Sequence, residues 1–171
     1  MLIWIFGQTR SALSSILSQY LGAKKLESIK KLPAQAIFII VIIGVLILAI
    51  SFPFAEHIFQ FYNASGTILE YAITYYRIRV FGFPFTLFVI GVFGTFRGLQ
   101  NTFYPMLVAI IGTIVNIALD LLFVYGLEGY IPAMNIEGAA YASVIAQIVM
   151  AGIAGYLLLT KTSIPLKVSL P

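Results

Sequence analysis

The sequence predicts an all-α integral membrane protein, with four complete transmembrane helices and a partial one near the N-terminus. Three observations predict this class. Hydrophobic residues make up 61% of the 171 residues and charged residues only 9%, whereas soluble domains carry roughly 25% charged residues. The apolar residues gather in long runs that approach the roughly 20 residues a membrane-spanning helix needs. The connectors between these runs are short and polar, so we expect one unit, 1–171, without a soluble catalytic domain.

The first segment, 2–21, is half apolar and half small or polar, with Arg10 and four serines in its middle and second half. Alone it would cross a membrane poorly, because polar side chains are costly in hydrocarbon. We interpret it as the inner end of a span that packs against protein and whose outer part is missing. The alternative is a helix lying on the membrane surface, for which an apolar stripe flanked by several lysines is expected.

The second span, 34–54, is a nearly unbroken apolar run that is far too long for a strand. The connector before it holds four lysines against one glutamate, and Pro33 suits the first turn of a helix. The connector after it has acidic residues but no lysine or arginine. His57, the only histidine, lies there, and we expect no ligand role for it.

The third span, 68–96, is longer than the membrane core requires. Pro84 removes one backbone hydrogen bond within it, which predicts a kink near Gly82. Its outer end groups tyrosines with Arg77 and Arg79, as in an interfacial aromatic belt with arginines that reach toward the headgroups.

The fourth span, 104–125, carries a polar stripe. Residues three and four apart share a helix face, so Thr113, Asn116 and Asp120 lie on one side of an apolar rod. A carboxylate near the centre of a spanning helix costs on the order of 2.5 to 3.5 kcal/mol on insertion scales. A water-filled cavity, a bound cation or a proton would offset that cost.

A second interpretation of Asp120 is structural. At about 1.5 Å per residue the carboxylate lies roughly 24 Å beyond Tyr104, in the outer third of a roughly 30 Å core, where it could reach the headgroups. Asn116 favours the first interpretation, because it shares the same face and lies near mid-membrane.

The last span, 137–160, opens with Glu137, whose charge complements the positive end of a helix. Ser143 and Gln147 are four residues apart and could supply oxygens to a shared site. The alternative for Ser143 is a hydrogen bond to a carbonyl of its own helix. An adjoining face carries small residues at the spacing that lets helices approach closely in lipid: Gly138, Ala142 and Ala146.

The charged residues divide between two sides of the membrane. One side is basic and the other acidic, which by the positive-inside rule predicts a multi-pass protein of the cell (inner) membrane with a cytoplasmic C-terminus. The net charge of +4 then reports orientation, and we expect no nucleic-acid partner. The sequence has no cysteine, nucleophile elbow, phosphate-binding loop or zinc motif, so we expect neither an enzyme nor a cofactor.

Three motifs in succession, FRGLQNTFYPM, NIALDLLFVYG and IEGAAYASVIAQ, resemble the multidrug and toxic compound extrusion (MATE) family, in the branch of the DNA-damage-inducible protein F (DinF-like) relatives. The resemblance covers nearly the whole chain. It implies two lobes of six helices that work by alternating access. This chain would supply the end of the second helix through the sixth of the amino-terminal lobe, without the first helix or the second lobe, which become its implied partners.

The resemblance also implies roles for single residues. Asn116 and Asp120 match the cation site of the amino-terminal lobe, Ser143 matches its sixth-helix hydroxyl, and Tyr75 matches a fourth-helix tyrosine. Tyrosine can stack on cationic aromatic ligands, which makes Tyr75 a possible cavity residue. Thr113 and Gln147 are further possible cavity residues from the helix faces described above. If the coupling ion is Na⁺ instead of H⁺, Asp120 and Asn116 would ligate it.

The resulting hypothesis is a Na⁺- or H⁺-coupled antiporter, embedded in membrane lipid, that exports drugs such as organic cations or lipophilic compounds. We expect the chain alone to be inactive. Two alternatives stay open. A flippase for lipid-linked precursors would line its cavity with several arginines, whereas Arg77 and Arg79 are predicted at the outer rim. In a noncatalytic structural subunit, Asn116 and Asp120 would only hold helices together.

Overall fold

The computed structural model describes residues 2–24, 26–63, 65–127 and 130–162. These residues form seven α-helices and no strand; the turn between the last two helices is closed by an isolated bridge between Leu127 and Ile131. The helices are α1 (Leu2–Gly22), α2 (Leu26–Ser51), α3 (Ala55–Phe61), α4 (Gly66–Val80), α5 (Phe83–Gly98), α6 (Phe103–Tyr125) and α7 (Asn135–Lys161).

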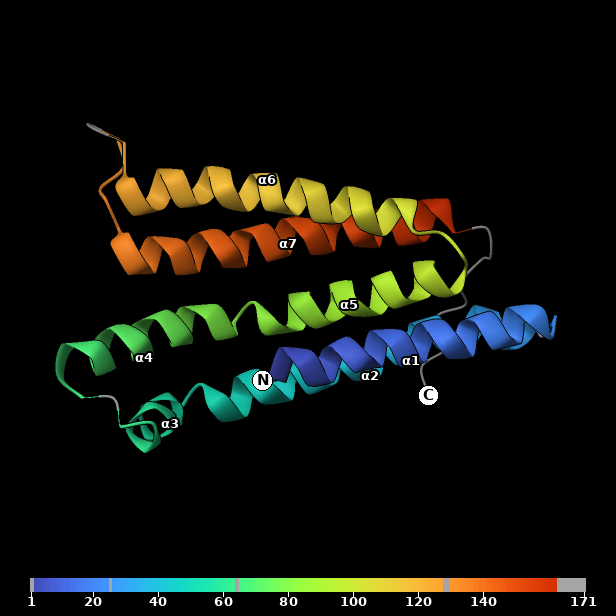
Figure 1. The fold of residues 1–171 in the computed structure, drawn as a ribbon, viewed down its shortest axis with the longest axis horizontal. Coiled ribbons are helices and arrows are strands. Elements are labelled where there is room, and N and C mark those ends of the chain that lie inside the picture. Colours follow the sequence, from blue (N-terminus) through green and yellow to red (C-terminus); the bar gives the residue numbers. More distant parts are fainter. Residues whose placement is uncertain (1, 25, 64, 128–129, 163–171) are drawn as a thin grey trace.

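Helix α5 is the centre of the arrangement (Figure 1). It packs against α1 and α2 on one side and against α7 on the other, while α6 and α7 form an antiparallel pair along the far edge. The buried core joins side chains of four helices, α2, α5, α6 and α7, among them Ile37, Val92, Phe96, Val108 and Ala154.

Within the described residues, three helices are long and apolar enough to cross a membrane: the part of α2 from Ile29 to Ser51, α6 and α7. Helices α4 and α5 together form a fourth, bent by 48° at their junction. The predicted all-α membrane class is confirmed, with three spans among the described residues, or four when the bent α4–α5 pair counts as one. Helix α6 presents an exposed apolar stripe of the kind that contacts lipid, formed by Ile110, Ile114, Ile117 and Leu121.

The bend between α4 and α5 confirms the kink predicted near Gly82. Helix α4 ends at Val80, and Pro84 lies in the first turn of α5, where its missing N–H removes no hydrogen bond. The carbonyl of Gly82 accepts hydrogen bonds from both the backbone N–H and the side-chain hydroxyl of Thr86. The junction is therefore a helix restart with satisfied backbone groups.

The predicted start of the second span at Pro33 is wrong, because α2 begins at Leu26 and contains this proline in its interior. Ile29 and Pro33 lie one turn apart, and both are buried where α2 packs against α1 and α5. Burial of these two side chains offsets the hydrogen bond that the proline removes. The predicted connector 55–67 also holds a short helix, α3, which packs against α4.

The connectors gather at two ends of the molecule. The α1–α2 and α5–α6 connectors and the end of α7 lie at one end, on the right of Figure 1. Helix α3, the start of α4 and the α6–α7 turn lie at the other. This distribution agrees with the two sides into which the sequence divides its basic and acidic residues.

Candidate functional site

A partly open pocket of about 230 Å³ lies near the middle of α6 and α7. One side chain reaches it from the end of α4, and the others come from the facing surfaces of α6 and α7. The lining residues are Arg79, Gly112, Thr113, Asn116, Ser143, Ala146, Gln147 and Met150. Four of the predicted site residues, Thr113, Asn116, Ser143 and Gln147, are thus brought together from two helices.

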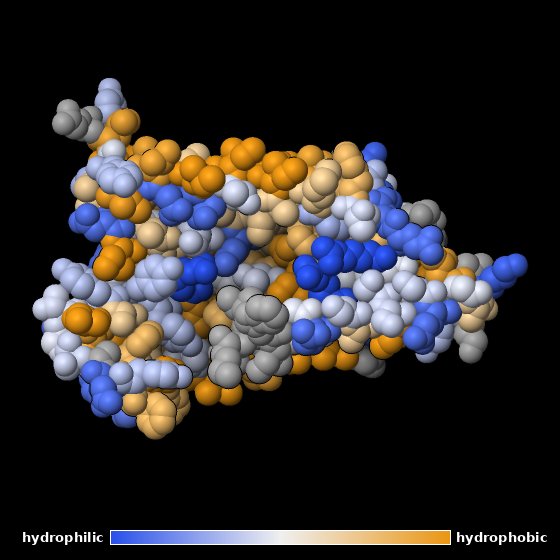
Figure 2. Space-filling view, viewed as in Figure 1, coloured by the Kyte–Doolittle hydropathy of each residue, from blue (hydrophilic) through white to orange (hydrophobic). Residues whose placement is uncertain are grey.

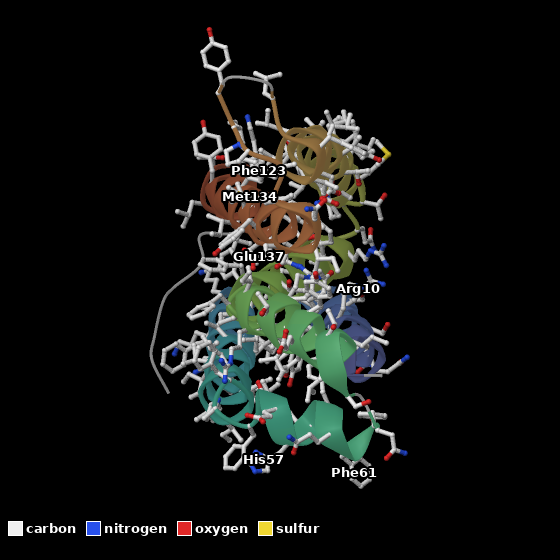
Figure 3. All side chains as sticks on the ribbon, turned by 90° about the vertical axis from the view of Figure 1, so that its left-hand side faces the viewer. Arg10, His57, Phe61, Phe123, Met134 and Glu137 are labelled. Atoms are coloured by element: carbon white, nitrogen blue, oxygen red, sulfur yellow. The ribbon has the colours of Figure 1, made fainter. Side chains whose placement is uncertain are left out.

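Glycines set the distance between the two helices. A Cβ on Gly112 would overlap the Sδ of Met150, and a Cβ on Gly138 would lie 2.5 Å from the carbonyl oxygen of Phe123. The same carbonyl accepts a 2.9 Å hydrogen bond from the backbone N–H of Met134, which fixes the α6–α7 turn. Phe123, Met134 and Glu137 mark this turn in Figure 3. The polar stripe of α6 is therefore held beside α7.

Several polar atoms at the pocket are buried without a hydrogen-bond partner among the described residues. They are Arg79 Nη1, Asn116 Nδ2 and Gln147 Oε1, and Asp120 Oδ1 lies one helix turn from Asn116. Leaving one such group unsatisfied costs about 1 to 3 kcal/mol, and more for a charged group. This concentration favours a bound ion, a substrate group, water or another polar segment at the pocket.

Asp120 is half-buried, and its Oδ1 is shielded from solvent. The pocket lining ends at Asn116, one turn before Asp120 on the same face of α6. The carboxylate therefore lies next to the pocket without contributing to its wall. The shielded Oδ1 fits the first interpretation of the sequence, in which the carboxylate faces the protein.

The two hydroxyls of the pocket differ in their bonding. Thr113 Oγ1 donates a 2.9 Å hydrogen bond to the carbonyl of Ala109, as Ser and Thr in helices often do. Ser143 makes no hydrogen bond to the described residues. Its hydroxyl remains available to a ligand, and the backbone bond that the sequence left as an alternative is not formed.

Arg79 was missed as a pocket residue, because the neighbouring tyrosines suggested an interfacial position. Residues two apart on a helix point to different sides. Arg77 is exposed, with its guanidinium 5.8 Å from the ring centre of Phe52, whereas Arg79 turns into the pocket. The two-residue spacing of Arg77 and Arg79 was the sequence signal that their side chains lie in different environments. Tyr75, one turn before Arg79, is 38% exposed and does not line the pocket.

The donor set suits a proton or a hard monovalent cation. No three His, Cys, Asp or Glu side chains gather within the described ranges, so a transition-metal site is not assembled by them. Oxygen atoms of Asn116, Asp120 and Ser143 are the type of ligand that hard cations prefer. His57 lies on α3 at the edge of the molecule, away from α6 and α7 (Figure 3).

Hydrophilic side chains gather across the middle of one face of the molecule (Figure 2). They lie between the α6–α7 pair and α1, and hydrophobic side chains line the α6 border of the same face. A band of polar groups thus runs along this face, between the α6–α7 pair and α1.

Comparison with known proteins agrees with this arrangement. A family model described as MatE matches residues 1–122. The DNA damage-inducible protein F of Escherichia coli (strain K12) is 29% identical over 138 residues, which cover 81% of this chain and 29% of that protein. The chain therefore spans less than a third of the length of this relative.

Two solved structures of a multidrug resistance MATE family transporter of the MOP superfamily match nearly the whole chain. The inward-facing one has a TM-score of 0.86 at 26% identity, covering 96% of this chain and 36% of that chain. The outward-facing one has a TM-score of 0.87 at 26% identity, covering 98% and 36%. The family match, the relative and both structures agree, and the chain belongs to the MatE family, the multidrug and toxic compound extrusion (MATE) proteins.

Proposed function

We propose that the protein carrying this chain is a Na⁺- or H⁺-coupled antiporter that exports drugs or other organic compounds, with Asp120 as the coupling carboxylate. The observation that carries the proposal is the buried, unpaired Oδ1 of Asp120 beside a polar pocket in a membrane-spanning helix. A carboxylate in that position is stabilised by protonation or by a cation. Asn116 and Ser143 supply further oxygens if the ion is Na⁺.

Coupling requires that the ion and the substrate prefer different conformations of the whole protein, because a ligand shifts an equilibrium only through differential affinity. The chain is as similar to the inward-facing as to the outward-facing structure, with TM-scores of 0.86 and 0.87. This similarity supports a lobe that moves as a unit. Ion binding at Asp120 would then bias the position of that unit relative to the rest of the transporter.

We place the connectors rich in lysine, together with the C-terminus, on the cytoplasmic side of the cell membrane. The sequence supports this orientation through the excess of lysine and arginine on one side. Because the chain covers 29% of its Escherichia coli relative, transport is proposed for the whole protein that carries it. Its substrate would be an organic cation or a lipophilic compound.

A second candidate, a flippase for lipid-linked precursors, gains support from Arg79. The sequence analysis predicted Arg79 at the outer rim of the membrane, and this position argued against the arginine-lined cavity that a flippase would need. In the structure its Nη1 is buried at the pocket without a partner. A guanidinium there suits an anionic group such as a phosphate.

Transport in proteoliposomes separates the two functions. The full-length protein is reconstituted, and a Na⁺ gradient or a pH gradient is imposed separately. We expect one of the two gradients to drive export of a fluorescent organic cation. Movement of a labelled lipid-linked precursor, with no gradient-driven export of the cation, would replace the antiporter with the flippase. Failure of both gradients to drive any substrate would contradict the proposal.

A further inference from the structure

A second polar cluster lies between α1 and α5, away from the pocket on α6 and α7. It surrounds a partly open cavity of about 230 Å³. Two arginines and three serines line it, and no acidic side chain within the described residues does: Arg10, Ser11, Ser14, Ser15 and Arg97. Arg10 is labelled on α1 in Figure 3. The cluster therefore carries two positive charges and several hydroxyl donors.

Close packing between the helices fixes the position of this cluster. A Cβ on Gly94 would lie 3.1 Å from the carbonyl oxygen of Arg10, and a Cβ on Gly98 would lie 2.6 Å from the Cβ of Leu17. The hydroxyl of Ser18 donates a 3.2 Å hydrogen bond to the carbonyl of Gly98. The backbone of α1 is thus pressed against the last turns of α5, the helix that carries Arg97.

The donors of the cluster lack partners. Arg10 Nε is buried without a hydrogen bond. Ser11, Ser14 and Ser15 donate no hydrogen bond to the described residues. Seven other hydroxyls of the described residues donate to the carbonyl four residues earlier: Ser18, Ser51, Thr86, Thr95, Thr113, Thr160 and Thr162. The serine hydroxyls of the cluster are therefore free to bind a ligand.

The charges of the cluster specify the ligand. Two guanidinium groups line one cavity without a carboxylate, so they repel each other, and the buried Nε of Arg10 has no hydrogen-bond partner. A tetrahedral oxyanion offers several acceptor oxygens, and guanidinium groups bind phosphate in a bidentate geometry. Serine hydroxyls donate to the remaining oxygens. A cavity of about 230 Å³ holds a phosphate group with room for ordered water.

We propose that Arg10, Arg97 and the serines of α1 bind a phosphate group, carried either by an anionic phospholipid or by a phosphorylated solute. This site is separate from the ion site on α6 and does not depend on the proposed antiport. Arg97 lies in the last turn of α5, at the end of the molecule that the sequence predicts to be cytoplasmic. The phosphate would therefore be bound from the cytoplasmic half of the membrane.

Binding to the purified full-length protein in detergent tests the site with three probes: dioleoyl phosphatidylglycerol, inorganic phosphate, and oleate as an anion without phosphate. Native mass spectrometry measures the two lipids, and a thermal shift measures inorganic phosphate. We expect phosphatidylglycerol or inorganic phosphate to bind at least about tenfold more weakly after Arg10→Gln or Arg97→Gln. Arg97 is exposed, so Arg97→Gln removes a charge from the cluster without opening the core.

The exposed Lys31 provides a matched control, because Lys31→Gln removes one positive charge from the same end of the molecule. The Lys31→Gln variant should bind phosphatidylglycerol and inorganic phosphate as tightly as the unmodified protein does. Binding of phosphatidylglycerol alone identifies a lipid headgroup, whereas competition by inorganic phosphate identifies a soluble source as well. Equal binding of oleate, an equal loss in Lys31→Gln, or no loss in either arginine variant would overturn the phosphate site.

Discussion

The Oε1 atom of Gln147 on α7 lies directly against Gly82, at the junction where α4 and α5 bend by 48°. A single Cβ added to Gly82 would overlap this oxygen. Gln147 also lines the pocket with Asn116 and Ser143. The bend and the pocket therefore share one side chain, and we expect a change at either place to affect the other through this contact.

The contact predicts a strong coupling between these two positions. Gly82→Ala should lower both the melting temperature and transport, because the new Cβ displaces the carboxamide of Gln147. The double variant Gly82→Ala with Gln147→Ala should recover much of the melting temperature, with a coupling free energy above about 0.5 kcal/mol. A double-mutant cycle of thermal unfolding in detergent measures it. Strictly additive effects would show that the contact carries no energy.

The close approach of α6 and α7 predicts opposite effects for two glycines on one helix. Gly138→Ala should destabilise the protein by about 1 to 3 kcal/mol, because its Cβ meets the backbone of Phe123 on α6. Gly152→Ala meets nothing within 4 Å and should be neutral or stabilise α7 by up to about 1 kcal/mol. Denaturant-dependent unfolding in the same detergent compares them. Equal stability of the two variants would contradict the packing.

Arg79 predicts how the pocket discriminates charge. Removing its guanidinium with Arg79→Gln should strengthen binding of an organic cation and weaken binding of a phosphate-bearing lipid, because the pocket loses a positive charge. Fluorescence titration with each ligand measures both. Arg77→Gln is the control, since Arg77 lies outside the pocket over Phe52. The role of Arg79 would be refuted by affinities that change equally in the two variants.

We expect the substitution Ser143→Ala to lower ion affinity without lowering the stability of the protein. The Ser143 hydroxyl makes no hydrogen bond to the described residues, so Ser143→Ala should leave the melting temperature nearly unchanged. Ion affinity should fall about fivefold, the effect of roughly 1 kcal/mol. Ser51→Ala removes a hydroxyl that bonds to the carbonyl of Ile47 and does not line the pocket, and it serves as control. Unchanged ion affinity in Ser143→Ala would remove this residue from the site.

The sequence was most informative where a residue contrasts with its surroundings. Asn116 and Asp120 stand out because most of α6 around them is apolar. Pro84 predicted the bend because a proline does not continue a helix, and the structure places it in the first turn of a new one. Local sequence rules gave wrong predictions where contacts between helices determine the structure. Pro33 lies within α2 because its burial against other helices outweighs its preference for a first turn.

Arg79 and Arg10 show why the other residues of the two cavities could not be predicted from the sequence. Arg79 resembled Arg77 in sequence, and only the packing of α4 against α7 places it at the pocket. Arg10 stood in a segment of mixed polarity that predicted a poor span. Arg10 and Arg97 are more than eighty positions apart in the chain, and they line one cavity only because α1 packs against α5. No local sequence pattern indicates such a contact.

The role of Asp120 is tested most directly by measuring ion release from the purified full-length protein when substrate is added. An unbuffered solution with a pH electrode detects protons, and a Na⁺-selective electrode detects sodium. Glu137→Gln is the control, because it removes an exposed carboxylate from the first turn of α7. We predict release of H⁺ or Na⁺ from the unmodified protein and from Glu137→Gln, and none from Asp120→Asn. Equal release from Asp120→Asn would contradict the assignment of the coupling carboxylate.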